Sequence, residues 1–116
     1  MTQRSFSPDD QAAFAELSGD YNPIHLDSLK ARRTRFGYPV VHGIHALLWA
    51  LEILASQSSG FLKLASLNTS FSQPIGVGET VRLVLKTTDK TCAEIQLLTE
   101  NEQAAQITVT CLPSEI

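Results

Sequence analysis

The sequence predicts an α+β fold in which a curved antiparallel sheet of about five strands wraps around one central helix. Residues 43–55 form an apolar run that only His45 and Glu52 interrupt. A helix that is hydrophobic on every side is buried on most of its faces. The segments that follow it alternate apolar and polar residues, as half-buried strands do. One buried helix followed by several such strands favours a sheet curved around that helix.

The size and charge of the chain limit what it can be. Its 116 residues suffice for one compact domain with a core and are too few for two, so we expect a single domain over residues 1–116. The net charge of −3 gives no electrostatic reason to expect nucleic acid or an anionic membrane as partner. No apolar run approaches the ~20 residues of a membrane-spanning helix, and the first residues lack the apolar core of a signal peptide. Cys92 and Cys111 lie in strand-like segments without a metal-ligand pattern, and we read them as buried free thiols in a reducing cytoplasm.

The first helix is predicted after a short strand at residues 4–6. Ser7 is a good N-cap, and Pro8 occupies the first helical position. Asp9 and Asp10 complement the helix dipole in the first turn, and Gly19 ends the helix.

The segment 20–41 is expected to be a long irregular loop. It holds Asn22 and Pro23, then a short basic turn that Asp27 caps. A loop of this length is usually functional. The basic residues of the turn are Lys30, Arg32, Arg33 and Arg35.

Four strands are predicted after the helix, with tight connections between them. Pro74 and the glycines of residues 76–78 close the first strand, and polar residues at 89–90 and 100–102 fit hairpin turns. The expected strands are residues 62–72, 79–88, 91–99 and 105–111. The strand at residues 4–6 joins them as a fifth.

One segment carries a chemical motif. Asp20 and His25 stand five residues apart around Asn22 and Pro23. On a regular helix, side chains five apart diverge by roughly 140°. On an irregular segment with a fixed proline φ they can converge on one water molecule and act as an acid–base pair.

The motif resembles a family signature. Residues 18–25, Ser-Gly-Asp-Tyr-Asn-Pro-Ile-His, match the pattern S-G-D-x-N-P-[LIV]-H of (R)-specific enoyl-CoA hydratases and related MaoC-type dehydratases. Residues 37–43 are similar to the family's P-V-H-G entry to the central helix, and residues 71–81 to its F-x-x-P-x-x-x-G-[DE]-x-V pair of strands. These motifs follow one another in the family's order over most of the chain.

The resemblance implies a hot-dog fold and a hydro-lyase that reversibly hydrates trans-2-enoyl-CoA to (R)-3-hydroxyacyl-CoA. Asp20 and His25 would be the catalytic pair, and the backbone N–H of Gly43 would stabilise the enolate-like oxygen of the thioester. Asn22, Pro23 and His42 would contact the substrate. The family reading implies no metal and no cofactor, since coenzyme A is part of the substrate, and it implies a homodimer with the acyl tunnel beside the interface.

Alternatives remain open at this stage. The substrate is either a coenzyme A ester or an acyl-carrier-protein thioester, and the basic turn would attract either partner or be solvated surface. A hot-dog thioesterase would place its carboxylate on the central helix, where Glu52 is the acidic candidate. A non-catalytic acyl-CoA-binding dimer is a third reading.

Several residues also have simpler readings. Asp20 and His25 would then be a turn cap and a satisfied polar residue, and Gly43 a packing glycine. His25, His42 and His45 lack the spacing of a metal site. His45 departs from the family's usual apolar residue, and would narrow the acyl pocket, favour a polar substrate or point into the dimer interface.

Overall fold

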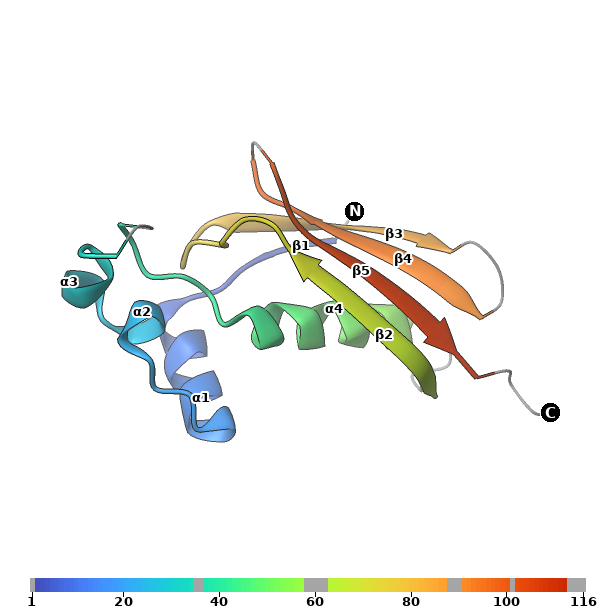
Figure 1. The fold of residues 1–116 in the computed structure, drawn as a ribbon, viewed down its shortest axis with the longest axis horizontal. Coiled ribbons are helices and arrows are strands. Elements are labelled where there is room, and N and C mark those ends of the chain that lie inside the picture. Colours follow the sequence, from blue (N-terminus) through green and yellow to red (C-terminus); the bar gives the residue numbers. More distant parts are fainter. Residues whose placement is uncertain (1, 35–36, 58–62, 88–90, 101, 113–116) are drawn as a thin grey trace.

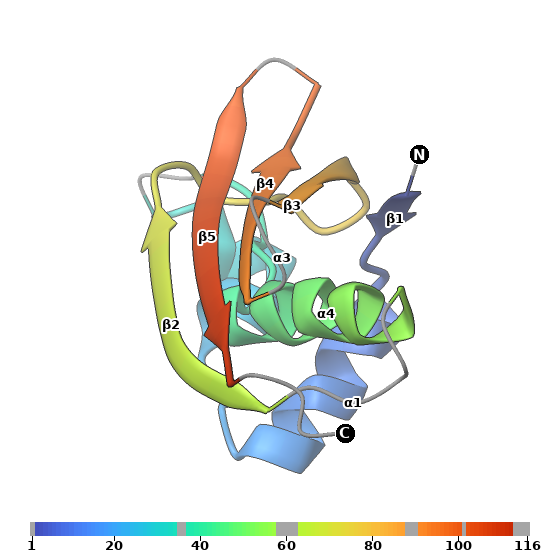
Figure 2. The same cartoon turned by 90° about the vertical axis from the view of Figure 1, so that its right-hand side faces the viewer.

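A computed structural model describes residues 2–34, 37–57, 63–87, 91–100 and 102–112. Five antiparallel strands form one sheet in the order β1-β3-β4-β5-β2. The sheet curves around the long helix α4, and three shorter helices gather at the N-terminal end of α4 (Figures 1 and 2). The strands are β1 Thr2–Ser5, β2 Leu64–Phe71, β3 Thr80–Thr87, β4 Cys92–Leu98 and β5 Gln103–Cys111, and the helices are α1 Pro8–Ser18, α2 Pro23–Leu26, α3 Ser28–Ala31 and α4 Gly43–Ser56. The predicted α+β fold with five strands is confirmed.

Local sequence explains how α1 begins and ends. The Ser7 hydroxyl accepts the N–H of Asp10, and the Asp10 carboxylate accepts the N–H of Ser7, which makes a capping box. Gly19 adopts φ 79°, a left-handed conformation that glycine takes without steric cost. The predicted cap and end of this helix are therefore confirmed. The motif segment begins at its last residue, Ser18.

The core lies between α4 and the concave face of the sheet. Alternate residues of β3, β4 and β5 point inward, as their predicted periodicity requires. Trp49 and Leu54 of α4 pack with them. The fully buried inward-facing strand residues are Val81, Ile95, Leu97, Ala105, Ile107 and Val109.

Four expectations need correction. Segment 20–41 is not one long loop, because Pro23 and Asp27 each start a single helical turn, α2 and α3. β2 is exposed along nearly its whole length rather than half-buried, because it is an edge strand that pairs only with β5. Cys92 and Cys111 form no disulfide and are only half-buried, since both lie near the ends of their strands.

The fourth correction concerns α4. Its side chains are not buried all round, because Ile44 is 56% exposed and Leu48 is 48% exposed one turn later. Among the described residues, no helix or strand fully covers that face (Figure 1). The turn residues predicted at 89–90 lie outside the described part of the chain. Within that part, no helix is both long and apolar enough to cross a membrane.

Candidate active site

Asp20 is held just beyond the end of α1. Its backbone N–H donates to the Ser18 hydroxyl at 3.2 Å, and that hydroxyl donates to the carbonyl of Phe14 at 2.7 Å. Its carboxylate oxygen Oδ1 accepts the N–H of Asn22 at 3.2 Å. The carboxylate is therefore fixed by its own turn, and its side chain remains half exposed to solvent.

The single turn α2 presents His25. The Asn22 side chain caps α2 by accepting the N–H of Ile24 at 3.1 Å, and Pro23 occupies the first helical position. Asn22 therefore caps a helical turn, where an irregular segment was expected. Asn22 and Pro23 are both exposed.

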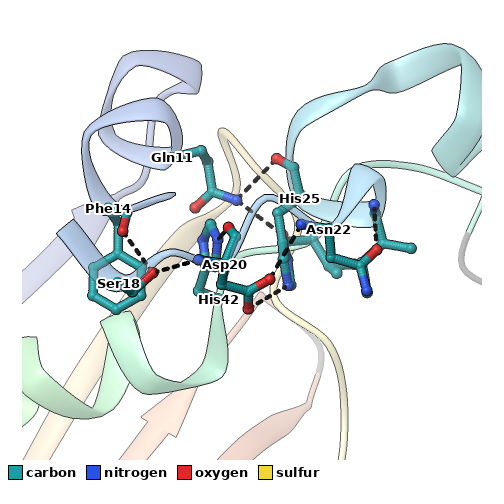
Figure 3. A network of polar contacts seen from close by, with 9 residues as sticks. Gln11, Phe14, Ser18, Asp20, Asn22, His25 and His42 are labelled. Carbon is teal, nitrogen blue, oxygen red and sulfur yellow. Dashed lines mark hydrogen bonds and ion pairs between the residues drawn. The ribbon is translucent and has the colours of Figure 1, made fainter. Parts of the chain in front are cut away.

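The two ring nitrogens of His25 have different environments. Nδ1 lies 2.8 Å from the carbonyl oxygen of Val40. Because a carbonyl only accepts, Nδ1 carries the proton of the neutral ring, and Nε2 keeps its lone pair. Nε2 lies 3.7 Å from Oδ2 of Asp20, which is longer than a direct hydrogen bond. Asp20 and His25 thus direct two hydrogen-bond acceptors toward one region of the surface (Figure 3).

His42, the residue before α4, supports both members of the pair. Its ring stacks on the His25 ring with centroids 3.9 Å apart and also contacts Phe14. Its Nε2–H donates to the backbone carbonyl of Asp20 at 3.1 Å. The residue is only 2% exposed, so in this chain its ring presents little surface to a substrate. Its expected contact with substrate stays a prediction, and the geometry gives it a supporting role.

Gln11 is a site residue that the sequence reasoning missed. It lies on α1, is 1% exposed, and donates from Nε2 to the carbonyls of His25 and Val40, each at 3.0 Å. A signal was available in the sequence. Gln11 stands three and four residues before Phe14 and Ala15, on the face of the helix that those apolar residues bury, where a polar side chain needs partners.

The same cluster offers possible metal ligands. Asp20, His25 and His42 bring one ligand atom each within 4.8 Å of the others. This differs from the expectation that no third ligand has suitable placement. However, the two imidazole rings lie face to face at an interplanar angle of 26°. Ring nitrogens bind a metal in the plane of the ring, so nearly parallel stacked rings do not aim at a common ion. The cluster fits proton chemistry better than metal binding.

Gly43 begins α4 beside a pocket of about 270 Å³. The N–H groups of the first helical turn, at residues 43 and 44, have no acceptor among the described residues, as expected at a helix N-terminus. The pocket is also lined by Val40 and by residues 71–75. A Cβ on Gly43 would lie 3.3 Å from the tip of the Phe71 ring, so close packing is one reason for glycine here. Val40 connects this pocket to the Asp–His pair through its bond to His25.

Three other predicted features have clear positions. Lys30, Arg32 and Arg33 are exposed, while Arg35 lies outside the described residues. His45 stacks on Phe14 at 4.5 Å and meets Phe6 edge-on at 4.9 Å. It therefore packs α4 against the N-terminal segment and does not line the pocket beside Gly43.

The thioesterase reading rests on Glu52, and the structure gives it no support. Glu52 is exposed on α4, and it does not line the pocket beside Gly43.

The fold and this cluster define a hot-dog protein with a paired aspartate and histidine beside the N-terminus of its central helix. The family model described as "MaoC like domain" matches residues 1–109. The chain belongs to the MaoC-like family.

Named relatives agree with this membership. The chain is 28% identical over 112 residues to 3-hydroxybutyryl-CoA dehydratase of Methylorubrum extorquens, covering 96% of this chain and 66% of the relative. It is 36% identical over 87 residues to the (R)-specific enoyl-CoA hydratase of Aeromonas caviae, covering 73% of this chain and 64% of that enzyme. The chain thus spans just under two thirds of these relatives. The solved structure of an (R)-hydratase from A. caviae superposes with a TM-score of 0.78 at 27% identity, over 97% of this chain and 92% of that one.

Proposed function

We propose that this protein reversibly hydrates trans-2-enoyl-CoA to (R)-3-hydroxyacyl-CoA, with Asp20 and His25 as its acid–base pair. The observation that carries the proposal is the 3.7 Å separation of Asp20 Oδ2 and His25 Nε2, combined with the bond that ties His25 Nδ1 to Val40. The names of the two relatives support the reaction class, since one is a hydratase and the other a dehydratase of acyl-CoA thioesters.

The geometry suits the activation of one water molecule. A water has two hydrogens, and Asp20 Oδ2 and His25 Nε2 can accept one each. In the hydration direction, the water oxygen bonds to Cβ of the enoyl group while a proton passes to the pair. The π electrons move toward the thioester carbonyl, and the pair returns a proton to Cα. One water is consumed, and no electrons are gained or lost.

The developing enolate charge needs a hydrogen-bond donor. The free N–H of Gly43 at the positive end of α4 supplies it in this proposal. The thioester would lie in the pocket beside Gly43, with its acyl chain running along residues 71–75. No step requires a metal or a cofactor.

The substrate carrier is proposed to be coenzyme A. The exposed Lys30, Arg32 and Arg33 lie shortly after α2 in the chain and can attract phosphate groups. The same charges suit the acidic surface of a carrier protein, so the carrier is decided by comparing crotonyl-CoA with crotonyl-carrier protein as substrates.

We also propose a homodimer. The edge strand β2 exposes its backbone and the side chains of Leu64, Leu67 and Phe71, and α4 exposes Ile44 and Leu48. An uncovered apolar edge of this kind invites pairing with a second copy. The pocket beside Gly43 contains Phe71, so it would lie next to this interface. A single domain over residues 1–116 and a cytoplasmic location stay predictions.

The test is a spectrophotometric panel of enoyl-CoA esters of increasing chain length. Loss of the enoyl absorbance on addition of enzyme, with an (R)-3-hydroxyacyl product, supports the proposal. Release of free CoA thiol without hydration would indicate a thioesterase. Binding of acyl-CoA without turnover of any ester would indicate a binding module.

A further inference from the structure

Gln11 is a buried amide that reaches two carbonyl groups on different segments of the site. Its Nε2 donates to the backbone carbonyl of His25 and to that of Val40, each at 3.0 Å. Figure 3 shows the side chain extending from α1 into the space between these segments. One side chain therefore ties α2, which carries His25, to the chain just before α4.

The orientation of the amide follows from its partners. Both partners are carbonyl oxygens, which only accept, so the NH₂ group must face them. The other end of the amide, Oε1, is buried without a hydrogen-bond partner among the described residues. An unsatisfied buried acceptor is unfavourable for stability. An apolar side chain of similar size would avoid this cost but would leave the carbonyl of His25 without its donor from α1.

Val40, the second partner, links Gln11 to the imidazole ring of His25. The Val40 oxygen that accepts from Gln11 also accepts from His25 Nδ1 at 2.8 Å. Gln11 thus fixes both the backbone of His25 and the oxygen to which its ring bonds. As long as that oxygen stays in place, the proton is kept on Nδ1, and the lone pair of Nε2 faces Asp20.

We infer that Gln11 is a positioning residue, which holds His25 in the tautomer and orientation needed to activate water. The inference rests on the proposed function for its catalytic consequence. Among the described residues, the hydrogen bonds of Gln11 go to His25 and Val40 and not to the Asp20 carboxylate, so in this proposal it acts through His25 and Val40.

Two variants test the inference. Gln11→Met keeps the length of the side chain and removes both donors, and Gln11→Glu keeps its shape but places acceptors against two carbonyls. Each should lower kcat for crotonyl-CoA by about 10- to 10²-fold, the range for a small misplacement of a catalytic group, with KM little changed. The thermal midpoint of Gln11→Met should fall only slightly, because removal of the unsatisfied Oε1 partly offsets the loss of the two donated bonds. Gln3→Met on the exposed face of β1 is the matched control and should leave kcat unchanged.

A second readout does not depend on turnover. Long-range ¹H–¹⁵N correlation spectra distinguish the two neutral tautomers of a histidine, and His25→Gln assigns the His25 signals. Wild-type His25 should be the Nδ1–H form, and Gln11→Met should show a mixture of tautomers. An Nε2–H form in the wild type, or a Gln11→Met spectrum and kcat identical to wild type, overturns the inference. If the wild type hydrates no enoyl-CoA, the proposed function fails, and the tautomer of His25 in the Met variant still decides whether Gln11 positions it.

Discussion

The proposed chemistry of the site depends on which atoms of two side chains are already bonded. His25 Nδ1 is bonded to Val40, and Asp20 Oδ1 is bonded to the N–H of Asn22. These bonds leave His25 Nε2 and Asp20 Oδ2 as the atoms that face each other. In the proposed mechanism the site is therefore arranged before substrate binds, because one polar atom of each side chain is already held by a backbone group.

The first prediction concerns this pair. Asp20→Asn and His25→Gln should each lower kcat by about 10²- to 10⁴-fold, because a positioned acid–base group contributes that much. Acyl-CoA binding should be nearly unchanged, since neither side chain belongs to the core. The double variant should be little worse than either single one. Steady-state kinetics and calorimetric titration measure these effects, and Asp9→Asn on the exposed face of α1 is the control. Strictly multiplicative losses would mean that the two residues act in separate steps.

His45 gives a prediction about pH. Partial burial against Phe14 of α1 lowers the pKa of His45. The positive charges of Arg4 and His42 lower this pKa further, and the nearby Asp10 carboxylate raises it. The folded chain therefore takes up this proton less readily than the unfolded chain. The free energy of unfolding should decrease as the pH falls below about 6.5, the ordinary value for histidine.

Urea denaturation at about pH 8 and about pH 5 measures this effect. His45→Phe removes the titrating group and should reduce the difference in unfolding free energy between the two pH values. Phe14→Leu disturbs the same stack but keeps the histidine, so it should retain the wild-type difference. An unchanged difference in His45→Phe would assign the pH dependence to other groups.

At the scale of elements, a single substitution can test the role of the free N–H at the N-terminus of α4. His42 has φ −58° and ψ 122°, a conformation that allows proline at the next position. Proline is also well tolerated as the first residue of a helix. A proline at position 43 therefore removes the N–H while the helix start is kept.

Gly43→Pro should lower kcat by about 10²- to 10³-fold, the usual cost of losing one oxyanion donor. Gly43→Ala is the matched variant, because its Cβ meets the same Phe71 ring and its N–H remains. It should keep most of the activity, since Phe71 is half exposed and can shift. Circular dichroism checks that both variants fold. Equal activity in the two variants would mean that the N–H of Gly43 takes no part in catalysis.

The turn that follows α3 gives a prediction about charge. Charge reversal in Arg32→Glu/Arg33→Glu should raise KM for crotonyl-CoA at low salt and change kcat little, because exposed charges attract the phosphates of the substrate and do not take part in the proposed proton transfers. The difference should shrink at about 1 M salt, where charges are screened within about 3 Å. Lys86→Glu, a single charge reversal on the exposed face of β3, is the control; it makes half of this charge change away from the turn. An unaltered KM would mean that Arg32 and Arg33 are solvated surface residues without a role in substrate binding.

At the scale of the whole molecule, one chain leaves two apolar surfaces uncovered, on α4 and along β2. We expect light scattering to give a mass twice that of the 12.7 kDa chain. Leu67→Lys should weaken the dimer, because a lysine on an edge strand opposes pairing. Leu29→Lys is the control, since Leu29 is equally a surface leucine but lies on α3. A stable monomer of the wild type at micromolar concentration would contradict the dimer.

Many structural features of this protein can be predicted from short stretches of its sequence. The cap at Ser7, the end at Gly19, the alternation of β3 to β5 and the motif from Ser18 to His25 each depend on residues that are close in the chain. Short-range patterns predict such features, because periodicity and capping arise from neighbouring residues. For the same reason, the sequence predicted the fold and placed Asp20 and His25 within one short segment, between α1 and the end of α2.

Only the tertiary structure decided how the pair is supported. Gln11 is hydrogen-bonded to Val40, which is 29 positions away in the chain, and His42 is hydrogen-bonded to Asp20, which is 22 positions away. The exposure of Ile44 and of β2 likewise depends on which elements lie above them. No local pattern contains these contacts, because they arise when α1, α2 and the start of α4 pack together. The sequence therefore indicated which residues the proposed chemistry uses, and packing decided which atom of each one is free for it.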